Sequence, residues 1–249
     1  KQAMLTYHED RIPWDYLKNN YPRWKAEGRF LQLTVWFGFD VAHSHMIGTE
    51  NFLVGLLEEP EWATDVFDTY LTTSLDLCQR ILDAGYEFDG VFWYDDMGYK
   101  GTPFFSPQIY RELLQPYHKK VVDWAHERGM VTELHSCGFI EPLLPDIMQT
   151  GVEMLNPLEI KAGMDLLRIY EKYGDKIALM GGIDVREVYP NDLARIDAEL
   201  EKKIPIVMGK YGFILHSDHS IPKTVNYETY KHFVKKGLEL GTYSLCKEV

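Results

Sequence analysis

The segment with the clearest chemical potential is His135-Ser136-Cys137-Gly138, which directly follows the apolar run MVTEL. Side chains two residues apart on an extended strand project to the same face, so the His135 imidazole and the Cys137 thiolate can converge on one ion. Zinc accepts both donors, and a catalytic zinc site takes three protein ligands and leaves a position open. The pair therefore predicts part of a zinc site; the alternative is a core cysteine near a histidine.

A third zinc ligand must come from elsewhere in the chain. The segment HSDHSIP follows the last apolar run and offers His216, Asp218 and His219. In a barrel, the end of the last strand can face the end of an earlier strand across the mouth. We therefore expect this segment to complete the site with His135 and Cys137.

Carboxylates follow three apolar runs and are candidates for acid–base chemistry. Asp95 and Asp96 come after GVFWY, and since adjacent strand residues point to opposite faces, only one of them can aim into the site. That one is expected to donate a proton, anchor substrate or bind metal, with capping of backbone amides as the alternative. Glu159 is a candidate for contact with the metal or with a substrate proton, or for an ion pair with Lys161. Asp184 in GGID is a candidate to bind substrate or to shape a turn.

Two histidines and a set of aromatic residues are candidates for substrate contacts. His43 and His45 share the two-residue spacing of His135 and Cys137, in a long loop after the first apolar run. Large aromatic side chains near two run ends can line a mouth suited to a flat methylated ring or a corrin edge, and a packing role is the alternative. They are Trp36, Phe37, Trp93, Tyr94, Phe104 and Phe105.

The elements that must position these residues alternate along the chain. Short apolar runs, expected to be strands, cover 31–37, 90–94, 130–134, 152–155, 176–180 and 212–215. Helical stretches between them begin at Pro60 and at Ser106, the latter with a kink at Pro116, and an amphipathic helix covers 226–240. This alternation is typical of βα units on a parallel sheet and predicts an α/β protein of the (β/α)8 TIM-barrel type.

The number of strands suggests an incomplete barrel. A closed barrel needs eight strands, whereas about six are visible here, and the segment 7–30 resembles an irregular lead-in. We therefore expect the N-terminal strands to be lacking from this chain. With no linker, repeat or low-complexity tract, residues 1–249 are expected to form a single barrel domain.

The amino-acid composition limits the kinds of partner that the protein is expected to bind. The chain has 38 acidic and 26 basic residues and a net charge of -12, which disfavours binding to nucleic acid. No apolar run approaches the length of a membrane helix, and the first residues lack the apolar core of a signal peptide, so we expect a cytoplasmic protein. The three cysteines are widely spaced and imply no disulfide framework, and Cys78 and Cys246 are assigned no chemistry.

Three features together resemble the uroporphyrinogen decarboxylase superfamily: HSCG after a strand, GGID after a later strand, and a segment that ends in Ile-Pro before the final helix. They are most similar to its zinc-dependent, corrinoid-linked methyltransferases, which include methylcobalamin:coenzyme M methyltransferases and methyltransferase components of O-demethylases. In that branch the zinc ligands are the histidine and cysteine of His-x-Cys-Gly and a later cysteine before Leu/Ile-Pro. The resemblance places them at His135, Cys137 and His219.

His219 departs from the pattern of that branch, which has cysteine at this position. Imidazole can replace thiolate on zinc, but it leaves the site one negative charge poorer and the metal a stronger Lewis acid. The resemblance implies a methyltransferase that moves a methyl group between a small methylated substrate, such as a methyl ether, and a corrinoid carried by a partner protein. The alternatives are a metal-free decarboxylase and a scaffold without turnover.

Overall fold

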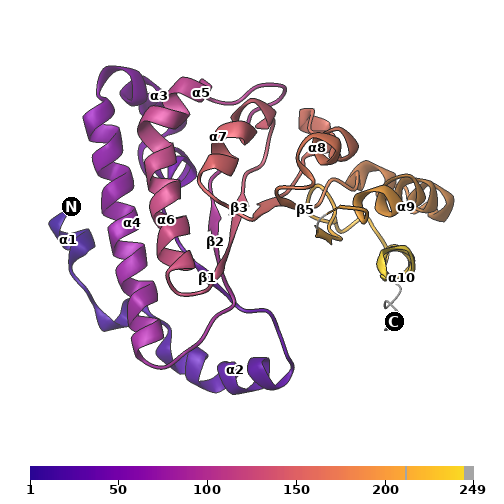
Figure 1. Ribbon diagram of the computed structural model, residues 1–249, viewed down its shortest axis with the longest axis horizontal. Coiled ribbons are helices and arrows are strands. Elements are labelled where there is room, and N and C mark those ends of the chain that lie inside the picture. Colours follow the sequence, from indigo (N-terminus) through magenta and orange to yellow (C-terminus); the bar gives the residue numbers. More distant parts are fainter. Residues whose placement is uncertain (211, 244–249) are drawn as a thin grey trace. The chain divides into compact units, whose positions relative to one another are not determined.

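A computed structural model describes residues 1–210 and 212–243, so Cys246 lies outside the described residues. The chain forms an α/β fold with six parallel strands and alternating helices (Figure 1). Each predicted apolar run overlaps one strand, which confirms the predicted fold class. The strands are β1 Gln32–Thr34, β2 Gly90–Tyr94, β3 Val131–His135, β4 Met154–Asn156, β5 Ala178–Met180 and β6 Phe213–Ile214.

The chain divides into two compact units. The first comprises 1–97, 103–136 and 142–153 and carries β1 to β3; the second comprises 98–102, 137–141 and the described part of 154–249 and carries β4 to β6. Within each unit the strands are neighbours in chain order, the arrangement typical of consecutive βα units. A single barrel domain over 1–249 stays a prediction.

The strands of the first unit sort their side chains onto two faces. In the parallel register, Leu33 lies opposite Val91, and Trp93 lies opposite Leu134. These four side chains are buried, and helix α6 packs against β3. The alternate residues lie on the other face, where Tyr94 is opposite His135. Tyr94 and His135 therefore lie on the face opposite these buried apolar side chains.

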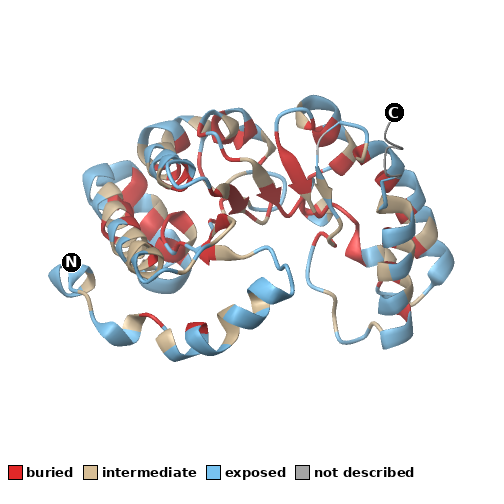
Figure 2. Ribbon diagram, turned by 60° about the horizontal axis from the view of Figure 1, so that its bottom comes forward, coloured by how far each residue is buried: buried red, intermediate tan, exposed pale blue. Residues whose placement is uncertain are grey.

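The first unit contains most of the helices. Figure 2 shows that their buried residues lie toward the strands and their exposed residues toward solvent. The α-helices are α1 Gln2–Leu5, α2 Trp14–Ala26, α3 Thr49–Glu58, α4 Pro60–Asp83, α5 Pro107–Ile109, α6 Gln115–His126 and α7 Leu144–Gln149. Short 3-10 helices cover Glu9–Arg11 and Glu141–Leu143, and π-helices cover Val41–Ile47 and Tyr110–Leu114.

Two segments of the first unit differ from the expectation of irregular structure. The lead-in 7–30 contains the 13-residue helix α2, which buries only Leu17 and continues through Pro22. The helix was not expected because proline normally interrupts a helix. The expected loop after β1 is instead the π-helix Val41–Ile47 followed by α3.

The helix predicted to begin at Ser106 does so, with its side chain accepting a hydrogen bond from the Ile109 amide. The interruption predicted at Pro116 takes the form of the π-helix Tyr110–Leu114 immediately before α6. Pro116 lies in the first turn of α6, where its missing N–H removes no hydrogen bond of that helix.

The second unit carries three longer helices. In its register Leu155 lies opposite Leu179, and Met180 lies opposite Ile214. The helices are α8 Leu166–Tyr173, α9 Leu193–Val207 and α10 Tyr227–Gly241, and 3-10 helices cover Ile160–Ala162 and Val185–Glu187. Each α-helix begins at a side-chain cap, which satisfies one of its free amides; the caps are Asp165, Asp192 and Asn226.

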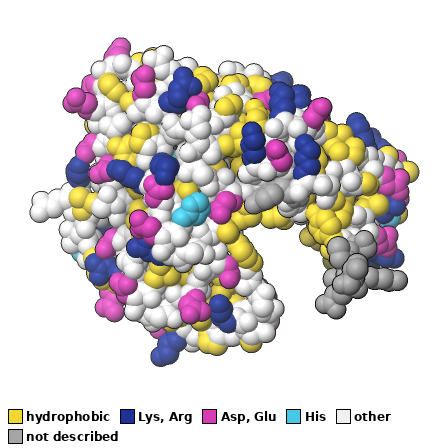
Figure 3. All heavy atoms as spheres, viewed as in Figure 1, with side chains coloured by type: hydrophobic (Ala, Val, Ile, Leu, Met, Phe, Trp, Pro, Cys, Tyr) yellow, Lys and Arg dark blue, Asp and Glu magenta, His cyan; other side chains and the backbone are white. Residues whose placement is uncertain are grey.

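The surface mixes both signs of charge. On the face in Figure 3, Lys and Arg side chains lie beside Asp and Glu side chains. Ion pairs of the described residues include Lys172 with Glu141 and Lys236 with Glu201. Among the helices that the structure describes, none combines the length and apolar character needed to cross a bilayer.

Candidate functional site

Asp96, His135 and Cys137 meet at the ends of β2 and β3. One ligand atom from each lies within 4.8 Å of the others, and His135 Nε2 is 3.6 Å from Asp96 Oδ1. The grouping is local in origin: Tyr94 pairs with His135, and each of the other two residues follows one of these by two positions. Period-two alternation therefore brings all three side chains to one face.

The donor set of this triad suits a metal ion. It offers an imidazole nitrogen, a thiol sulfur and a carboxylate oxygen, and all three side chains are half-buried. Zinc accepts each of these donors, and three protein ligands are the usual number at a catalytic zinc site. The structure therefore contains a possible metal-binding triad in which Asp96, which sequence reasoning placed among acid–base candidates, accompanies His135 and Cys137.

The HSDH segment after β6 distributes its side chains differently. Asp218 is fully buried and accepts hydrogen bonds from the Val185 amide at 2.8 Å and the Ile160 amide at 3.0 Å. This carboxylate therefore joins the segments that follow β4 and β5, and burial raises its pKa. His219 is exposed and is not a member of the triad, so its role as a zinc ligand stays a prediction.

Asp95 points to the opposite side of β2 from Asp96. Its carboxylate is fully buried, with Oδ2 2.7 Å from His118 Nε2 and Oδ1 accepting from the Asp40 amide at 2.8 Å. The His118 Nδ1 atom lies 3.0 Å from the Tyr110 hydroxyl. Burial raises the pKa of Asp95 and holds that of Tyr110 well above its ordinary value. The carboxylate thus joins β2 to α6 and to the segment before the first π-helix.

Sequence reasoning missed Tyr110 and His118. The signal was present, because residues eight apart lie on one face of a helix two turns away from each other. Gly38 also belongs to this network: a Cβ there would lie 2.5 Å from Asp95 Oδ2. The predicted choice between Asp95 and Asp96 is therefore realised as one buried and one half-buried carboxylate.

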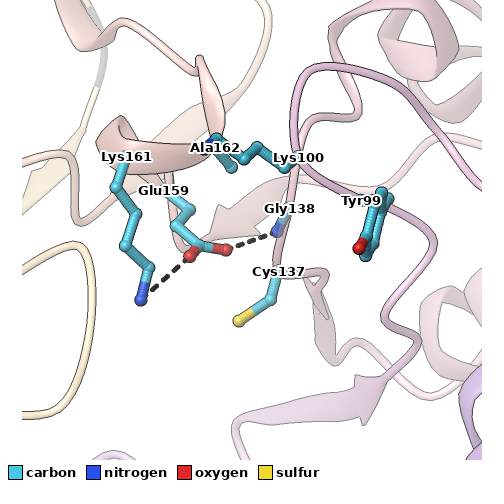
Figure 4. Close-up of a pocket in the computed structure, with 8 residues that line it drawn as sticks. Tyr99, Lys100, Cys137, Gly138, Glu159, Lys161 and Ala162 are labelled. Carbon is cyan, nitrogen blue, oxygen red and sulfur yellow. Dashed lines mark hydrogen bonds and ion pairs between the residues drawn. The ribbon is translucent and has the colours of Figure 1, made fainter.

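Cys137 also borders a cavity of about 370 Å³ in the second unit (Figure 4). Its lining comes from the segments after β2, β3 and β4: Gly98, Tyr99, Lys100, Cys137, Gly138, Glu159, Lys161 and Ala162. The first two segments approach through backbone alone, since a Cβ on Gly138 would lie 2.2 Å from the Gly98 carbonyl carbon. Only glycine at both positions allows this approach.

Glu159 forms the ion pair that the sequence offered as one of its roles. Its Oε1 lies 3.2 Å from Lys161 Nζ, and its Oε2 accepts a hydrogen bond of 2.7 Å from the Gly138 amide. The carboxylate is buried, and Figure 4 shows it between Lys161 and the residue that follows Cys137. Glu159 therefore fixes the backbone next to the thiol.

The two histidines after β1 have different surroundings. His43 is buried, stacks on Phe39 at a centroid distance of 4.3 Å and lies 3.0 Å from Thr49 Oγ1 through Nδ1. Burial lowers its pKa. His45 is exposed, with its ring 5.3 Å from that of Trp36. Their substrate contacts stay predictions, and His45 is the more accessible of the two.

Trp93 and Tyr94, the adjacent aromatic residues of β2, lie on opposite faces of the strand. Tyr94 is 40% exposed, and its ring centre lies 4.9 Å from that of His135. Trp93 is fully buried against Phe37 and His118 on the other face, so it takes the packing role rather than the predicted place at the mouth. Strand alternation is the reason, because neighbours cannot share a face.

Asp184 takes the turn role that its neighbouring glycines favour. Its carboxylate accepts hydrogen bonds from the Arg186 amide at 2.9 Å and from the Arg186 guanidinium at 2.6 Å. Burial disfavours the charged form, but the bonds from Arg186 outweigh it, so the pKa of Asp184 lies below its ordinary value. A contact with substrate stays a prediction.

The sequence of residues 39–238 matches the family described as uroporphyrinogen decarboxylase (URO-D). The chain belongs to the uroporphyrinogen decarboxylase family. This match covers the segment from the residue after Gly38 into α10 and includes every predicted site residue except Trp36 and Phe37. The superfamily expected from HSCG, GGID and the Ile-Pro segment is therefore confirmed.

Solved structures with this fold include a methyltransferase from Methanosarcina mazei. It superposes with a TM-score of 0.66 at 20% sequence identity, over 91% of this chain and 64% of that chain. This chain thus spans less than two thirds of the length of that protein. No curated protein shows significant similarity to the sequence. The likeness supports the fold and a partial barrel.

Proposed function

We propose that this protein is a zinc-dependent methyltransferase that moves a methyl group between a small methylated substrate and a corrinoid carried by a partner protein. The observation that carries the proposal is the convergence of His135, Cys137 and a carboxylate on one face of the strand ends. The family and a methyltransferase of the same fold support the reaction class. A cytoplasmic location belongs to the same proposal.

His135 and Cys137 are the two ligands that both the sequence and the geometry favour, and Asp96 or His219 is the third. The choice sets the charge of the site. Thiolate and carboxylate together neutralise a divalent cation, whereas thiolate with two imidazoles leaves one positive charge. We favour Asp96, because its oxygen lies beside the other two donors.

Bound zinc would supply Lewis acidity, which lowers the basicity of an oxygen or sulfur leaving group. The residues of this chain hold and orient the reacting groups. Glu159 binds the Gly138 amide and so fixes the turn that carries Cys137. The exposed ring of Tyr94 beside His135 offers a surface on which a flat substrate can rest.

Zinc content in a set of matched variants tests this proposal. We expect stoichiometric zinc in the purified protein, and loss of most of it in His135→Gln and Cys137→Ser, because each removes one of three ligands. Of Asp96→Asn and His219→Gln, only the variant of the true third ligand should lose zinc. His8→Gln serves as control because His8 is exposed and lies outside the site. Full zinc content in Cys137→Ser would refute the metal site.

Removal of the metal separates this proposal from a second one. The family name favours a metal-free decarboxylase, whose substrate carries many carboxylates. Among the described residues, the cavity beside Cys137 is lined by two lysines and no arginine. We expect chelation to abolish methyl transfer to a corrinoid protein and zinc to restore it. Decarboxylation of a porphyrinogen by the chelated protein would instead establish the second function.

A further inference from the structure

The buried carboxylate of Asp218 lies where three segments of the second unit meet. Asp218 follows β6, and its amide donates to the Ile183 carbonyl after β5 at 2.8 Å. Its Oδ1 accepts a hydrogen bond from the Val185 amide at 2.8 Å, and its Oδ2 accepts one from the Ile160 amide at 3.0 Å. The side chain is fully buried, and each oxygen has a backbone donor. The carboxylate therefore ties together the segments that follow β4, β5 and β6.

The bond to Ile160 continues toward the thiol. Ile160 directly follows Glu159, whose Oε2 accepts a hydrogen bond of 2.7 Å from the Gly138 amide. Gly138 is the residue after Cys137, and Figure 4 shows the Glu159 carboxylate and this bond beside the Cys137 side chain. Two hydrogen bonds, with Glu159 between them, thus connect Asp218 to the turn that carries the thiol.

The segment after β5 is also held by helix α9. The Gly182 carbonyl accepts a hydrogen bond from the buried Lys203 side chain at 2.8 Å, and the Asp184 amide donates to Glu199 at 2.8 Å. Val185 directly follows this turn. The turn therefore keeps two bonds to α9 when the bond between Val185 and the buried carboxylate is removed.

We propose that Asp218 is a positioning residue for the Cys137 thiol and acts through Ile160 and Glu159. The bond to the Ile160 amide fixes the backbone next to Glu159, so that the Glu159 carboxylate meets the Gly138 amide. A part in catalysis rests on the proposed function, because the positioned thiol would then be a zinc ligand. Loss of groups that orient metal ligands typically weakens metal binding about 10- to 100-fold.

Proline substitutions can remove the two bonds of Asp218 one at a time. Ile160 and Val185 are each the first residue of a 3-10 helix, and the residue before each is extended. Proline is tolerated at such a position and lacks the amide hydrogen. Ile160→Pro thus removes the bond that leads to Cys137, and Val185→Pro, the matched control, removes the other. Asp218→Asn offers one acceptor oxygen in place of two and should lose one bond.

Hydrogen exchange of the Gly138 amide, followed by NMR on the metal-free protein, measures the positioning. We expect about tenfold faster exchange in Ile160→Pro, because the Glu159 carboxylate is no longer held at the amide, and wild-type exchange in Val185→Pro. The amide of Leu200, a buried residue of α9, is the reference, since a general loss of stability accelerates both amides. Ile160→Pro should also raise the dissociation constant of zinc about tenfold.

The outcomes separate this inference from the proposed function. Wild-type exchange of Gly138 in both Ile160→Pro and Asp218→Asn, or an equal acceleration in Val185→Pro or at Leu200, would overturn the inference. An unaltered zinc dissociation constant in Ile160→Pro would also overturn it. Faster exchange confined to Gly138 in a protein that binds no zinc would retain the inference and refute the function. Zinc-dependent methyl transfer with unchanged Gly138 exchange in these variants would do the reverse.

Discussion

Two cysteines of the described chain occupy opposite environments. Cys78 is buried in α4, and burial raises the pKa of its thiol to about 12. Cys137 is half-buried, borders a cavity and belongs to the possible metal-binding triad. A thiol reacts through its thiolate form and needs access to the reagent. The two residues should therefore be chemically distinguishable.

Alkylation measures this difference. We expect iodoacetamide at pH 8 to modify Cys137 in the zinc-free protein while Cys78 stays unmodified, because Cys78 is both protonated and buried. Zinc should protect Cys137, since a coordinated thiolate is less available. Peptide mapping by mass spectrometry assigns each site. Equal labelling of the two cysteines in the folded protein, or no protection by zinc, would contradict the assignment.

At the scale of elements, the Asp95 carboxylate connects three parts of the first unit. Asp95 directly follows β2, and its carboxylate contacts His118 of α6 and accepts a hydrogen bond from the amide of Asp40, the residue before the first π-helix. Tyr110, at the start of the second π-helix, closes the network through His118. π-helical turns frequently occur at functional sites. Here a single buried group fixes both of them near the strand end that carries Asp96.

Removing His118 should therefore destabilise the first unit. We expect His118→Phe to lower the free energy of unfolding by about 3 kcal/mol, because it leaves a buried carboxylate without its partner. Tyr110→Phe removes only a hydroxyl and should cost about 1 kcal/mol. Urea denaturation followed by circular dichroism gives both values. A loss for Tyr110→Phe as large as that for His118→Phe would contradict this ranking.

At the scale of the whole molecule, the free energy of unfolding should depend on pH. Glu141 receives hydrogen bonds from Arg168 at 2.6 Å and from Lys172 at 2.8 Å. Burial opposes its ionisation, but these two partners outweigh it and lower its pKa from the ordinary value of 4.5. Folding thus favours the charged form. The stabilisation is present above pH 4.5 and is lost as the pH falls through the lower value of the folded protein.

The variant Glu141→Gln isolates this contribution. We expect it to lower the free energy of unfolding by about 1 kcal/mol at pH 7, since the pair partners are half exposed to solvent. The difference from the wild type should shrink as the pH falls from 4.5 through the lower pKa of Glu141 in the folded protein, because below that pKa the wild-type carboxylate is also uncharged. Thermal or urea unfolding from pH 3 to 7 measures it. A difference that is constant across this range would exclude the ion pair as its cause.

The strands were predictable because each is a short, apolar run that ends in polar residues. GVFWY and MVTEL both appear as strands within one residue of their expected bounds. Helix α2 was not predicted, because Pro22 lies inside it and proline normally interrupts a helix. The π-helix Val41–Ile47 was missed for a different reason: its seven residues are too few to show a helical apolar period.

The candidate site was predictable where it depends on strand spacing. The two-residue interval of His135 and Cys137 brought them together as expected, and the alternation of Asp95 and Asp96 separated their surroundings. That Asp96 lies beside these two residues follows from the register of β2 on β3, which could not be read from the sequence. The cavity could not be predicted from the sequence, because its lysines and its glycines come from loops that meet only in the folded chain.

The contact between Gly98 and Gly138 has a consequence for how such a protein can change. Main-chain hydrogen bonds hold the 98–102 loop to the turn after Cys137 and to Ala162, and a substitution of the side chain at position 100 leaves these bonds in place. Such a substitution changes which ligands the cavity binds, while the Cys137 thiol stays in place. A new ligand preference of the cavity can therefore evolve, or be engineered, while Cys137 keeps its position.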